Sequence, residues 1–451
     1  MRPIDIVFWG TLFLLAGLWW VADPLALQPS GFFPLRSAMV QLSGVLAMGC
    51  MSLAMILALR PRWPEHWLGG LDKMYRLHKW FGIGGLVFAV AHWLWSQGPK
   101  WAVGFGWLER PARGARPPVG NALEQLLLTQ RGTAEGIGEW AFYAVVLLIV
   151  VALVRLIPYR IFYRTHRLIA VAYLVLVFHS VVLMHFSYWT TPLGVLMAVL
   201  LAWGTVAAVL ALLRRIGAGR KVEGRIASLH YYPELRVLEG DIDIPEGWPG
   251  HRTGQFAFLS GDPSDGPHPY TIASAWNPAE HRLTFITKEL GDFTRTLRDK
   301  RYVGEPVTVE GPYGCFIFDD DCPLQIWIGA GIGITPFIAR MKQIAGERHA
   351  RQGRLPAQEI HLFHSTADYS EEAIAKLQAD AEAADVHLHV LHDKRDGRLT
   401  GDHIRAAVPG WREAGIWFCG PSGFAAAIRN DFARHGFNVG KRFHQEFFDM
   451  R

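Results

Sequence analysis

The sequence predicts a multidomain protein in which an all-α membrane region of six helices precedes a β-barrel and an α/β doubly wound sheet. Long apolar segments fill the first half of the chain. After Lys221, short stretches of alternating apolar and polar residues are typical of antiparallel strands. From Leu324 onward, apolar strands alternate with helical stretches, which is typical of a parallel sheet. The predicted domains are residues 1–215, 220–318 and 322–451.

The apolar segments of the first half have the length of membrane spans. Hydrophobic residues make up 51% of the chain and its mean hydropathy is +0.15, which is too apolar for an ordinary soluble protein. The predicted spans, each close to the roughly 20 residues that cross a bilayer, are Ile4–Val21, Ala38–Leu59, His78–Ser96, Trp140–Ile157, Leu168–Phe186 and Pro192–Leu213. A cleaved signal peptide is the alternative for the first span, but no small-residue cleavage site follows it, which favours an uncleaved anchor.

Positively charged residues predict the orientation of the spans. Lys and Arg gather after the second, fourth and sixth spans, at Arg60, Arg62, Lys73, Arg76, Arg160, Arg164, Arg167, Arg214, Arg215, Arg220 and Lys221. The longer loop at 97–137 also holds basic residues, but they are more dilute and mixed with acids. The positive-inside rule therefore places both termini in the cytoplasm of a cell-membrane protein. The net charge of +5 is accounted for by this orientation and predicts no nucleic-acid partner.

Two of the spans carry histidines, which are costly in hydrocarbon and therefore suggest a function. The third span holds His78 and His92, and the fifth holds His166 and His179. Under alternating topology, His78 and His166 lie near the inner face, and His92 and His179 lie near the outer face. Neutral imidazoles on two helices can hold a haem iron from both sides. The pattern suggests two haems stacked across the membrane, with these four histidines as metal ligands.

The spacing of these histidines fits one helix better than the other. Fourteen residues separate His78 from His92, which is about 21 Å along one helix face. Thirteen residues separate His166 from His179, which is about 220° of rotation on an ideal helix and requires a bulge, a bend or ligation from opposite flanks. His185 is the alternative outer ligand. A second alternative is that each histidine is a polar side chain hydrogen-bonded between helices.

A glycine-rich turn follows the first strand of the predicted parallel sheet. The segment "GAGIGITPF" at 329–337 places Gly329, Gly331 and Gly333 between a strand and a helix. Such glycines let the backbone approach a pyrophosphate at a helix N-terminus. Glycines also occur in strand-to-helix turns without a ligand, so this turn alone is weak support. The segment "HLHVLH" at 387–392 alternates with period two and is predicted to be a strand and not a metal site.

Four motifs in sequence order carry a resemblance to a known family. They are "HPYTIAS" at 268–274, "GPYG" at 311–314, "GAGIGITPF" at 329–337 and "CGPSGF" at 419–424, and together they resemble the ferredoxin–NADP reductase superfamily. The four membrane histidines make the chain similar to the ferric reductase and NADPH oxidase branch. That branch carries the reductase behind a six-helix membrane domain with two haems. The resemblance implies FAD, two haem b groups and NADPH or NADH as cofactors.

The resemblance also implies individual site residues. The FAD site would comprise His268, Pro269, Tyr270, Thr271, Ser274, Gly291 and Thr294. The nicotinamide cofactor would be bound by Gly329, Gly331, Gly333, Thr335, Pro336, Cys419 and Gly420. The terminal aromatic that covers the flavin ring would be Phe448, in preference to Phe447. Thr271, Cys419 and Phe448 would lie at the reacting atoms and are the expected catalytic residues.

The function implied by the resemblance is electron transfer from cytoplasmic NAD(P)H across the bilayer to a small external acceptor. Ferric iron or a ferric chelate is favoured over oxygen, because Ser96 stands where superoxide-forming relatives often have a histidine. A superoxide-generating NADPH oxidase is the alternative. A further alternative is a membrane-anchored flavin reductase for a quinone or a protein, with structural histidines. NADPH is expected by resemblance alone, since "FHSTADYS" lacks a basic residue, although Arg395 and Arg398 follow the next strand. The oligomeric state is not predicted.

Overall fold

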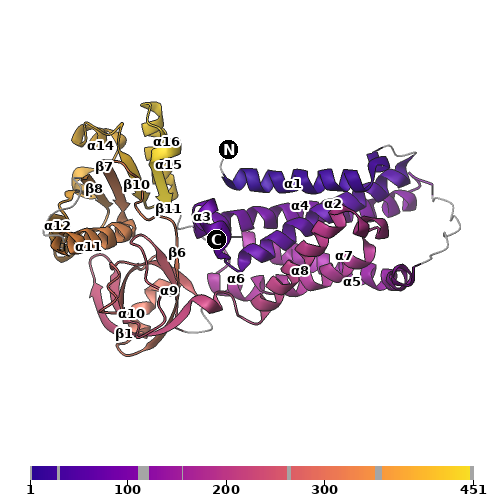
Figure 1. Ribbon diagram of the computed structural model, residues 1–451, viewed down its shortest axis with the longest axis horizontal. Coiled ribbons are helices and arrows are strands. Elements are labelled where there is room, and N and C mark those ends of the chain that lie inside the picture. Colours follow the sequence, from indigo (N-terminus) through magenta and orange to yellow (C-terminus); the bar gives the residue numbers. More distant parts are fainter. Residues whose placement is uncertain are drawn as a thin grey trace. The chain divides into compact units, whose positions relative to one another are not determined.

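The computed structural model describes residues 3–27, 31–109, 121–154, 156–261, 266–350 and 358–446. The chain divides into two compact units (Figure 1). The first comprises Met1–Pro64 and Lys73–Ile216, and the second comprises Glu65–Asp72 and Gly217–Arg451. A helical region is therefore followed by a sheet-containing region, as predicted.

The first unit is built from long helices. They are α1 (Pro3–Ala22), α2 (Phe32–Ala58), α4 (Leu71–Gly104), α5 (Ala122–Leu153), α6 (Tyr159–His166), α7 (Ile169–Leu183) and α8 (Pro192–Leu212), with the short helices η1 (Pro24–Leu27), α3 (Arg62–Leu68) and η2 (Phe186–Thr190) between them. Each of the six predicted spans overlaps one of the long helices. The helix that contains most of the fourth span begins 18 residues before Trp140, at Ala122, after Asn121 accepts a hydrogen bond from the Leu123 amide as its N-cap.

Five helices in the part of the chain that the structure describes are long and apolar enough to cross a membrane. They are α1, α2, α5, the α6–α7 segment Tyr159–Leu183, and α8. The predicted third span lies in α4, which is not among the five. This helix of 34 residues carries charged residues such as Asp72, Lys79 and Lys100 near its ends. Six spans with cytoplasmic termini therefore stay a prediction.

Helix α2 forms the most enclosed part of the first unit. It packs against α1, α7 and α8, and 67% of its most apolar window is buried. The Ser52 hydroxyl lies 2.8 Å from the Tyr173 hydroxyl on α7. On the outer helices, large apolar side chains such as Phe13 and Trp140 are 73% and 76% exposed. Apolar side chains directed outward from long helices fit a hydrocarbon surrounding and indicate a membrane protein.

The second unit begins with an antiparallel sheet. Its strands are β1 (Lys221–Tyr232), β2 (Val237–Asp243), β3 (Phe256–Ser260), β4 (His268–Thr271), β5 (Arg282–Lys288) and β6 (Pro306–Tyr313), flanked by η3 (Ala218–Arg220), α9 (Asp292–Arg295) and α10 (Leu297–Lys300). The strand order is β4-β3-β6-β1-β2-β5. A bridge between Ile272 and Phe285 links the segment after β4 to β5, the strand at the other edge. Full closure into a barrel stays a prediction.

A five-stranded sheet follows, in which all neighbouring strands run parallel. The strands are β7 (Leu324–Ala330), β8 (Glu359–Thr366), β9 (His387–His392), β10 (Gly415–Cys419) and β11 (Phe443–Glu446), in the order β11-β10-β7-β8-β9. The connecting helices are η4 (Gly331–Ile334), α11 (Thr335–Ala350), α12 (Glu371–Ala384), α13 (Asp393–Asp396), α14 (Gly401–Ala407), α15 (Ser422–Arg434) and α16 (Val439–Arg442).

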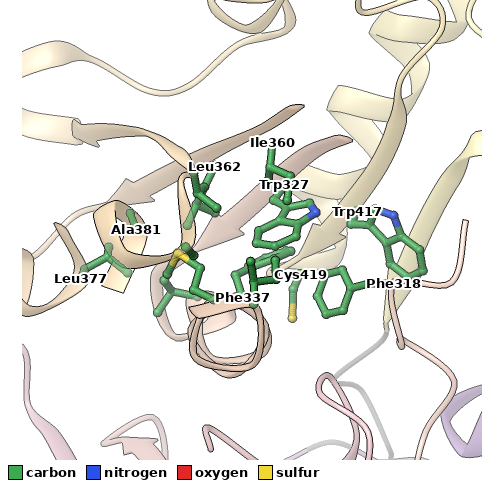
Figure 2. Packing of buried hydrophobic residues seen from close by; sticks show 14 of the residues in the cluster. Phe318, Trp327, Phe337, Ile360, Leu362, Leu377, Ala381, Trp417 and Cys419 are labelled. Carbon is green, nitrogen blue, oxygen red and sulfur yellow. The ribbon is translucent and has the colours of Figure 1, made fainter. Parts of the chain in front are cut away.

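Helices cover both faces of this parallel sheet, as a doubly wound fold requires. On one face, Phe337 and Met341 of α11 and Leu377 of α12 pack against Trp327 and Leu362 (Figure 2). On the other face, residues of α14 and α15 pack against alternate residues of β7 and β10. Successive strand residues point to opposite faces, so one apolar run supplies both cores.

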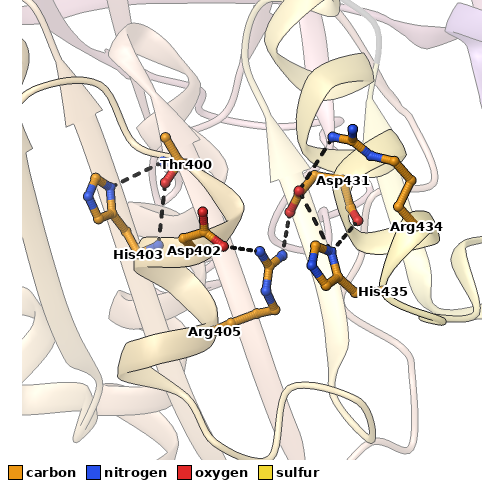
Figure 3. Close-up of polar contacts among 7 residues, drawn as sticks. All are labelled: Thr400, Asp402, His403, Arg405, Asp431, Arg434 and His435. Atoms are coloured by element: carbon orange, nitrogen blue, oxygen red, sulfur yellow. Dashed lines mark hydrogen bonds and ion pairs between the residues drawn. The ribbon is translucent and has the colours of Figure 1, made fainter.

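An ionic network joins α14 to α15 (Figure 3). The Arg405 guanidinium donates to the carboxylates of Asp402 and Asp431. Its side chain is 11% exposed, whereas the Asp402 carboxylate is 88% exposed and that of Asp431 is 21% exposed. Thr400 caps α14 in a reciprocal pair with His403. Asp431 is therefore the buried partner that neutralises Arg405.

Replacing Asp431 with Ala is expected to weaken the packing of α14 on α15 by about 1–3 kcal/mol, because a largely buried guanidinium loses its charged acceptor. Asp402→Ala is the matched control and should cost less than about 1 kcal/mol, since an exposed ion pair contributes little. Amide hydrogen exchange within α14 and α15 measures both effects. Equal protection in the two variants would contradict this assignment.

Candidate functional site

Four histidines predicted from the sequence form two pairs inside the first unit. The His78 ring of α4 lies 5.9 Å, centroid to centroid, from the ring of His166 on α6. The His92 ring, also on α4, lies 6.1 Å from the ring of His179 on α7. With metal–imidazole bonds of about 2 Å, two rings on opposite sides of one ion need centroids roughly 6 Å apart. Both pairs have the separation that a shared iron requires.

A break in the helix accounts for the thirteen-residue step. Helix α6 ends at His166, residues 167 and 168 form a turn, and α7 begins at Ile169. An uninterrupted helix would direct His166 and His179 about 220° apart. This irregular step separates the two rings along the chain, and each ring lies beside a histidine of α4.

Hydrogen bonds to backbone carbonyl groups determine which ring nitrogen carries the proton in three of these histidines. Nδ1 of His78 donates to the Ala54 carbonyl at 2.8 Å, and Nδ1 of His92 donates to Val40 at 2.9 Å. Nδ1 of His179 donates to Ala134 at 2.8 Å. A carbonyl oxygen only accepts, so Nδ1 carries the proton and Nε2 keeps its lone pair for a metal.

His166 differs from the other three histidines. Its Nδ1 is buried and has no hydrogen-bond partner among the described residues, while its ring stacks on Phe162 at 4.9 Å. A buried nitrogen without a hydrogen bond costs free energy of folding. A group bound between the two rings would contact Nε2, the second ring nitrogen of His166. The donor set of all four rings thus fits a pair of bis-histidine haem sites.

Glycines make room for the outer pair. A Cβ atom on Gly138 of α5 would lie 2.0 Å from Nδ1 of His179, and one on Gly44 of α2 would lie 3.3 Å from the His92 ring. These positions were not predicted, since glycine is common in membrane helices and its spacing gave no signal. His185, the alternative ligand, lies after α7 with its ring 5.1 Å from that of Tyr188.

The glycine-rich turn lies at the point where the strand order of the parallel sheet reverses. The chain runs from β7 to β8 and β9 on one side, then returns to β10 on the other side of β7. Doubly wound sheets bind ligands at this point. Gly331 has φ +56°, and a Cβ there would meet no atom within 4 Å. Gly333 is different, because its Cβ would lie 2.1 Å from the Cys419 carbonyl oxygen.

Thr335 and Pro336 open α11 directly after this turn. The Thr335 hydroxyl donates to the Ile332 carbonyl at 2.8 Å, and proline suits the first turn of a helix. Behind the turn, Nδ1 of the buried His364 donates to the Gly329 carbonyl at 3.0 Å. Burial lowers the pKa of His364 to about 4, so the ring is neutral at physiological pH. His364 was not predicted, because only the folded sheet shows that β8 lies beside β7.

Cys419 ends β10 opposite Gly329 of β7, with Gly420 following it. The Cys419 side chain is completely buried, and burial raises the pKa of its thiol well above the usual value. The thiol is therefore protonated and serves as a small neutral group. A Cβ on Gly420 would come within 2.7 Å of Ala330, so glycine is required at this crossing. Residues from both motifs therefore meet at the carboxyl ends of strands β7 and β10.

The residues expected to bind FAD lie along β4 and the following segments. Thr271 is buried opposite Phe256, and His268 and Pro269 pair with Leu259 and Phe258. Tyr270 lines an apolar cavity that also contains Ile226, Leu259 and Phe285. The Ser274 hydroxyl accepts from the Thr284 amide at 3.1 Å. The contacts of these side chains with flavin stay predictions.

The remaining predicted residues are less enclosed. The Thr294 hydroxyl accepts from the amides of Leu290 and Gly291 at 2.9 and 3.0 Å and stabilises the turn before α9. Arg395, a candidate for the extra phosphate of NADPH, is bonded to the neighbouring Asp396 at 2.9 Å. Phe448 lies outside the described residues.

A cavity within the second unit borders the glycine turn. Gly331, Ile332, His364 and Thr366 line it together with Lys288 and Asp368. The Lys288 ammonium donates to Asp368 at 2.7 Å and lowers the pKa of that carboxyl below its usual value. This ion pair links β5 of the antiparallel sheet to the end of β8. The cavity is a candidate binding site beside the glycine turn and has a fixed charge pair at one side.

The family model of the ferric reductase like transmembrane component matches residues 43–177. The matched segment contains His78, His92 and His166 and ends two residues before His179. This segment of the chain is therefore similar to a ferric reductase like transmembrane component. The predicted resemblance to the ferric reductase and NADPH oxidase-like family is confirmed, since the relatives of this chain include both oxidases and flavohemoproteins.

Three relatives illustrate the range of the match. The chain is 27% identical to a flavohemoprotein of Deinococcus radiodurans over 43% of this chain and 52% of that protein. It is 32% identical to an NADPH oxidoreductase of Mycobacterium tuberculosis over 27% of this chain and 30% of that protein. It is 26% identical to respiratory burst oxidase homolog protein E of Arabidopsis thaliana over 44% of this chain and 23% of that protein. The chain thus spans about half or less of these relatives, which support the predicted class of NAD(P)H-dependent oxidoreductases.

Gly331→Val is expected to weaken NAD(P)H binding roughly tenfold or more, since a side chain at this position would block the approach of a pyrophosphate to the backbone of the turn. FAD content should stay constant, because no side chain of the antiparallel sheet is altered. Gly333→Val is the comparison and should lose both cofactors, because its Cβ overlaps the Cys419 carbonyl. Titration of NAD(P)H and flavin per chain measure the two effects, and equal loss of both cofactors in Gly331→Val would contradict the assignment.

Proposed function

We propose that this protein is a transmembrane oxidoreductase that passes electrons from cytoplasmic NAD(P)H, through FAD and two b-type haems, to an external acceptor. The observation that carries the proposal is the pair of neighbouring imidazoles at each of two levels along α4, with ring centroids 5.9 and 6.1 Å apart. The match to a ferric reductase like transmembrane component supports it independently. The proposed topology has six spans, with both termini in the cytoplasm.

The chain's own residues would hold and orient each group. The carbonyl groups of Ala54, Val40 and Ala134 bind Nδ1 of three imidazole rings, so that Nε2 of each keeps its lone pair. When bound, flavin accepts an electron pair and releases electrons singly to haem iron, which carries one at a time. About 21 Å of helix rise between His78 and His92 would separate the two sites along the membrane normal.

The cytoplasmic end would bind the electron donor at the strand-order reversal. Gly331 leaves an open approach to the turn, and the amides at the start of α11 would favour a pyrophosphate. The neutral His364 holds the turn through the Gly329 carbonyl. The protonated thiol of Cys419 adds no negative charge beside a nicotinamide. The names of the relatives, an NADPH oxidoreductase and flavohemoproteins, support this pair of cofactors.

We favour ferric iron, bound in an anionic chelate, as the external acceptor. Arg36 lies near the start of α2, which the proposed topology places at the outer face. Its guanidinium donates to the carbonyls of Trp95 and Ser96 at 3.1 Å. A fixed cation near the outer histidine pair would attract an anionic chelate. Initial rates with ferric citrate and with oxygen distinguish this acceptor from the superoxide-forming alternative, for which the oxygen rate would be the larger.

Replacing His92 or His179 with Ala should reduce the haem content from two per chain to one, because each would lose one of two axial ligands at the outer site. NAD(P)H should still reduce the flavin in both variants. Reduction of a membrane-impermeant acceptor should fall to background, since about 21 Å of helix would then lack a carrier. Haem per flavin, flavin reduction and external reduction are measured on one preparation.

His185→Ala is the control for this experiment and should retain both haems, because its ring faces Tyr188. A His179 variant that keeps two haems would make the ligand assignment wrong. Loss of one haem with undiminished external reduction would instead overturn the transmembrane route. Absence of b-type absorption bands in the wild-type protein would favour the membrane-anchored flavin reductase.

Gly138→Val tests the outer site without changing a ligand. The new side chain would overlap the His179 ring, which lies 2.0 Å from the Cβ position, and should therefore remove the outer haem. Gly136→Val on the same helix is the matched control, since nothing lies within 4 Å of its Cβ. Reduced-minus-oxidised spectra count the haems in each variant. Two haems in Gly138→Val would contradict the close packing on which the outer site depends.

A further inference from the structure

A group of histidines outside the proposed electron route lies on the edge of the parallel sheet. Strand β9 is the outermost strand, and its residues His387 and His389 pair in register with His361 and Phe363 of β8. Alternate residues of a strand share a face, so Glu359, His361, His387 and His389 gather on one side. The alternating segment 387–392 is a strand, as predicted, but the neighbouring strand adds two further metal-binding side chains.

The ligand atoms of this group converge. One side-chain nitrogen or oxygen from each of Glu359, His361 and His387 lies within 4.8 Å of the others. The rings of His361 and His387 are stacked with centroids 4.7 Å apart. Nε2 of His361 lies 2.8 Å from a Glu359 carboxylate oxygen. Two imidazoles and one carboxylate form a donor set that zinc and other divalent transition metals favour.

His389 is the fourth member of this group and contacts His361. Its Nε2 lies 3.2 Å from Nδ1 of His361, and its ring stacks on Phe363 with a centroid distance of 4.4 Å. A neutral His389 can accept the Nδ1 proton of His361. That hydrogen bond leaves the lone pair of His361 Nε2 beside the Glu359 carboxylate, where both are available to a metal ion, as in known metal sites.

We propose that Glu359, His361 and His387 bind one divalent transition-metal ion of the zinc class, with His389 as a positioning residue. The ion would join the edge strand β9 to β8 and stabilise their pairing. Glu359 and His387 begin their strands, whereas the glycine turn follows the opposite end of β7. From Ile326, which pairs with His361, to Ala330 is about 13 Å along the strand. The site is therefore structural and separate from the electron route.

Equilibrium dialysis of the full-length, haem-loaded protein against Zn²⁺ tests this proposal. The wild-type protein should hold one more zinc ion per chain than His387→Ala or Glu359→Gln. His389→Ala should bind the same ion about 10–100-fold more weakly, the usual effect of removing an outer hydrogen-bond partner. His392→Ala is the matched control on the same strand and should bind like the wild type, because its Nε2 faces the Ala367 carbonyl.

Thermal unfolding provides a second measurement. Zn²⁺ should raise the unfolding temperature of the second unit in the wild type and in His392→Ala, whereas Mg²⁺ should not. The shift should be absent in Glu359→Gln, which preserves side-chain shape and should retain its flavin. Equal zinc content and equal shifts in the wild type, His387→Ala and Glu359→Gln would overturn the proposal. Absence of stoichiometric zinc in the wild type would overturn it as well.

Discussion

The hydrogen bonds from ring Nδ1 atoms to helix carbonyl groups are the interaction on which the membrane half depends. A histidine in hydrocarbon is tolerated only when its polar atoms are satisfied. His78, His92 and His179 each meet this requirement at Nδ1, through bonds of 2.8–2.9 Å. The same bonds determine which nitrogen remains free. One constraint therefore explains both how these three rings are satisfied among apolar helices and why their Nε2 atoms keep a lone pair for a metal.

The second unit depends on a comparable backbone constraint. The strand-order reversal between β7 and β10 brings the glycine turn and the Cys419 segment together at the carboxyl ends of these two strands. Gly333 fits against the Cys419 carbonyl only because it has no side chain, whereas Gly331 faces open space. Gly333 thus allows close packing against Cys419, and Gly331 leaves space for a ligand. The neutral His364 then holds the turn from the adjacent strand.

The two halves use histidine in different ways. In the first unit, the paired rings are separated by the distance that a shared iron needs, and Nδ1 of His78, His92 and His179 is bonded to the backbone. On the sheet edge, the His361 ring is stacked on that of His387 and is hydrogen-bonded to His389 and to Glu359. Elsewhere in the sheet, His364 is buried and acts as a hydrogen-bond donor. The surroundings, and not the residue type, decide the role.

The sequence by itself determined the broad class of the fold and singled out the candidate site residues. Long apolar segments and strand periodicity are local signals, so a helical region followed by a doubly wound sheet was predictable, and the four histidines and the glycine turn could be named as candidates. Only the tertiary structure decided that His166 and His179 lie next to His78 and His92 of α4. It also showed that Gly138 packs against His179, that His364 is bonded to Gly329 and that Glu359 is bonded to His361. Each of these depends on a neighbour distant in the chain, and no local pattern encodes which neighbour that is.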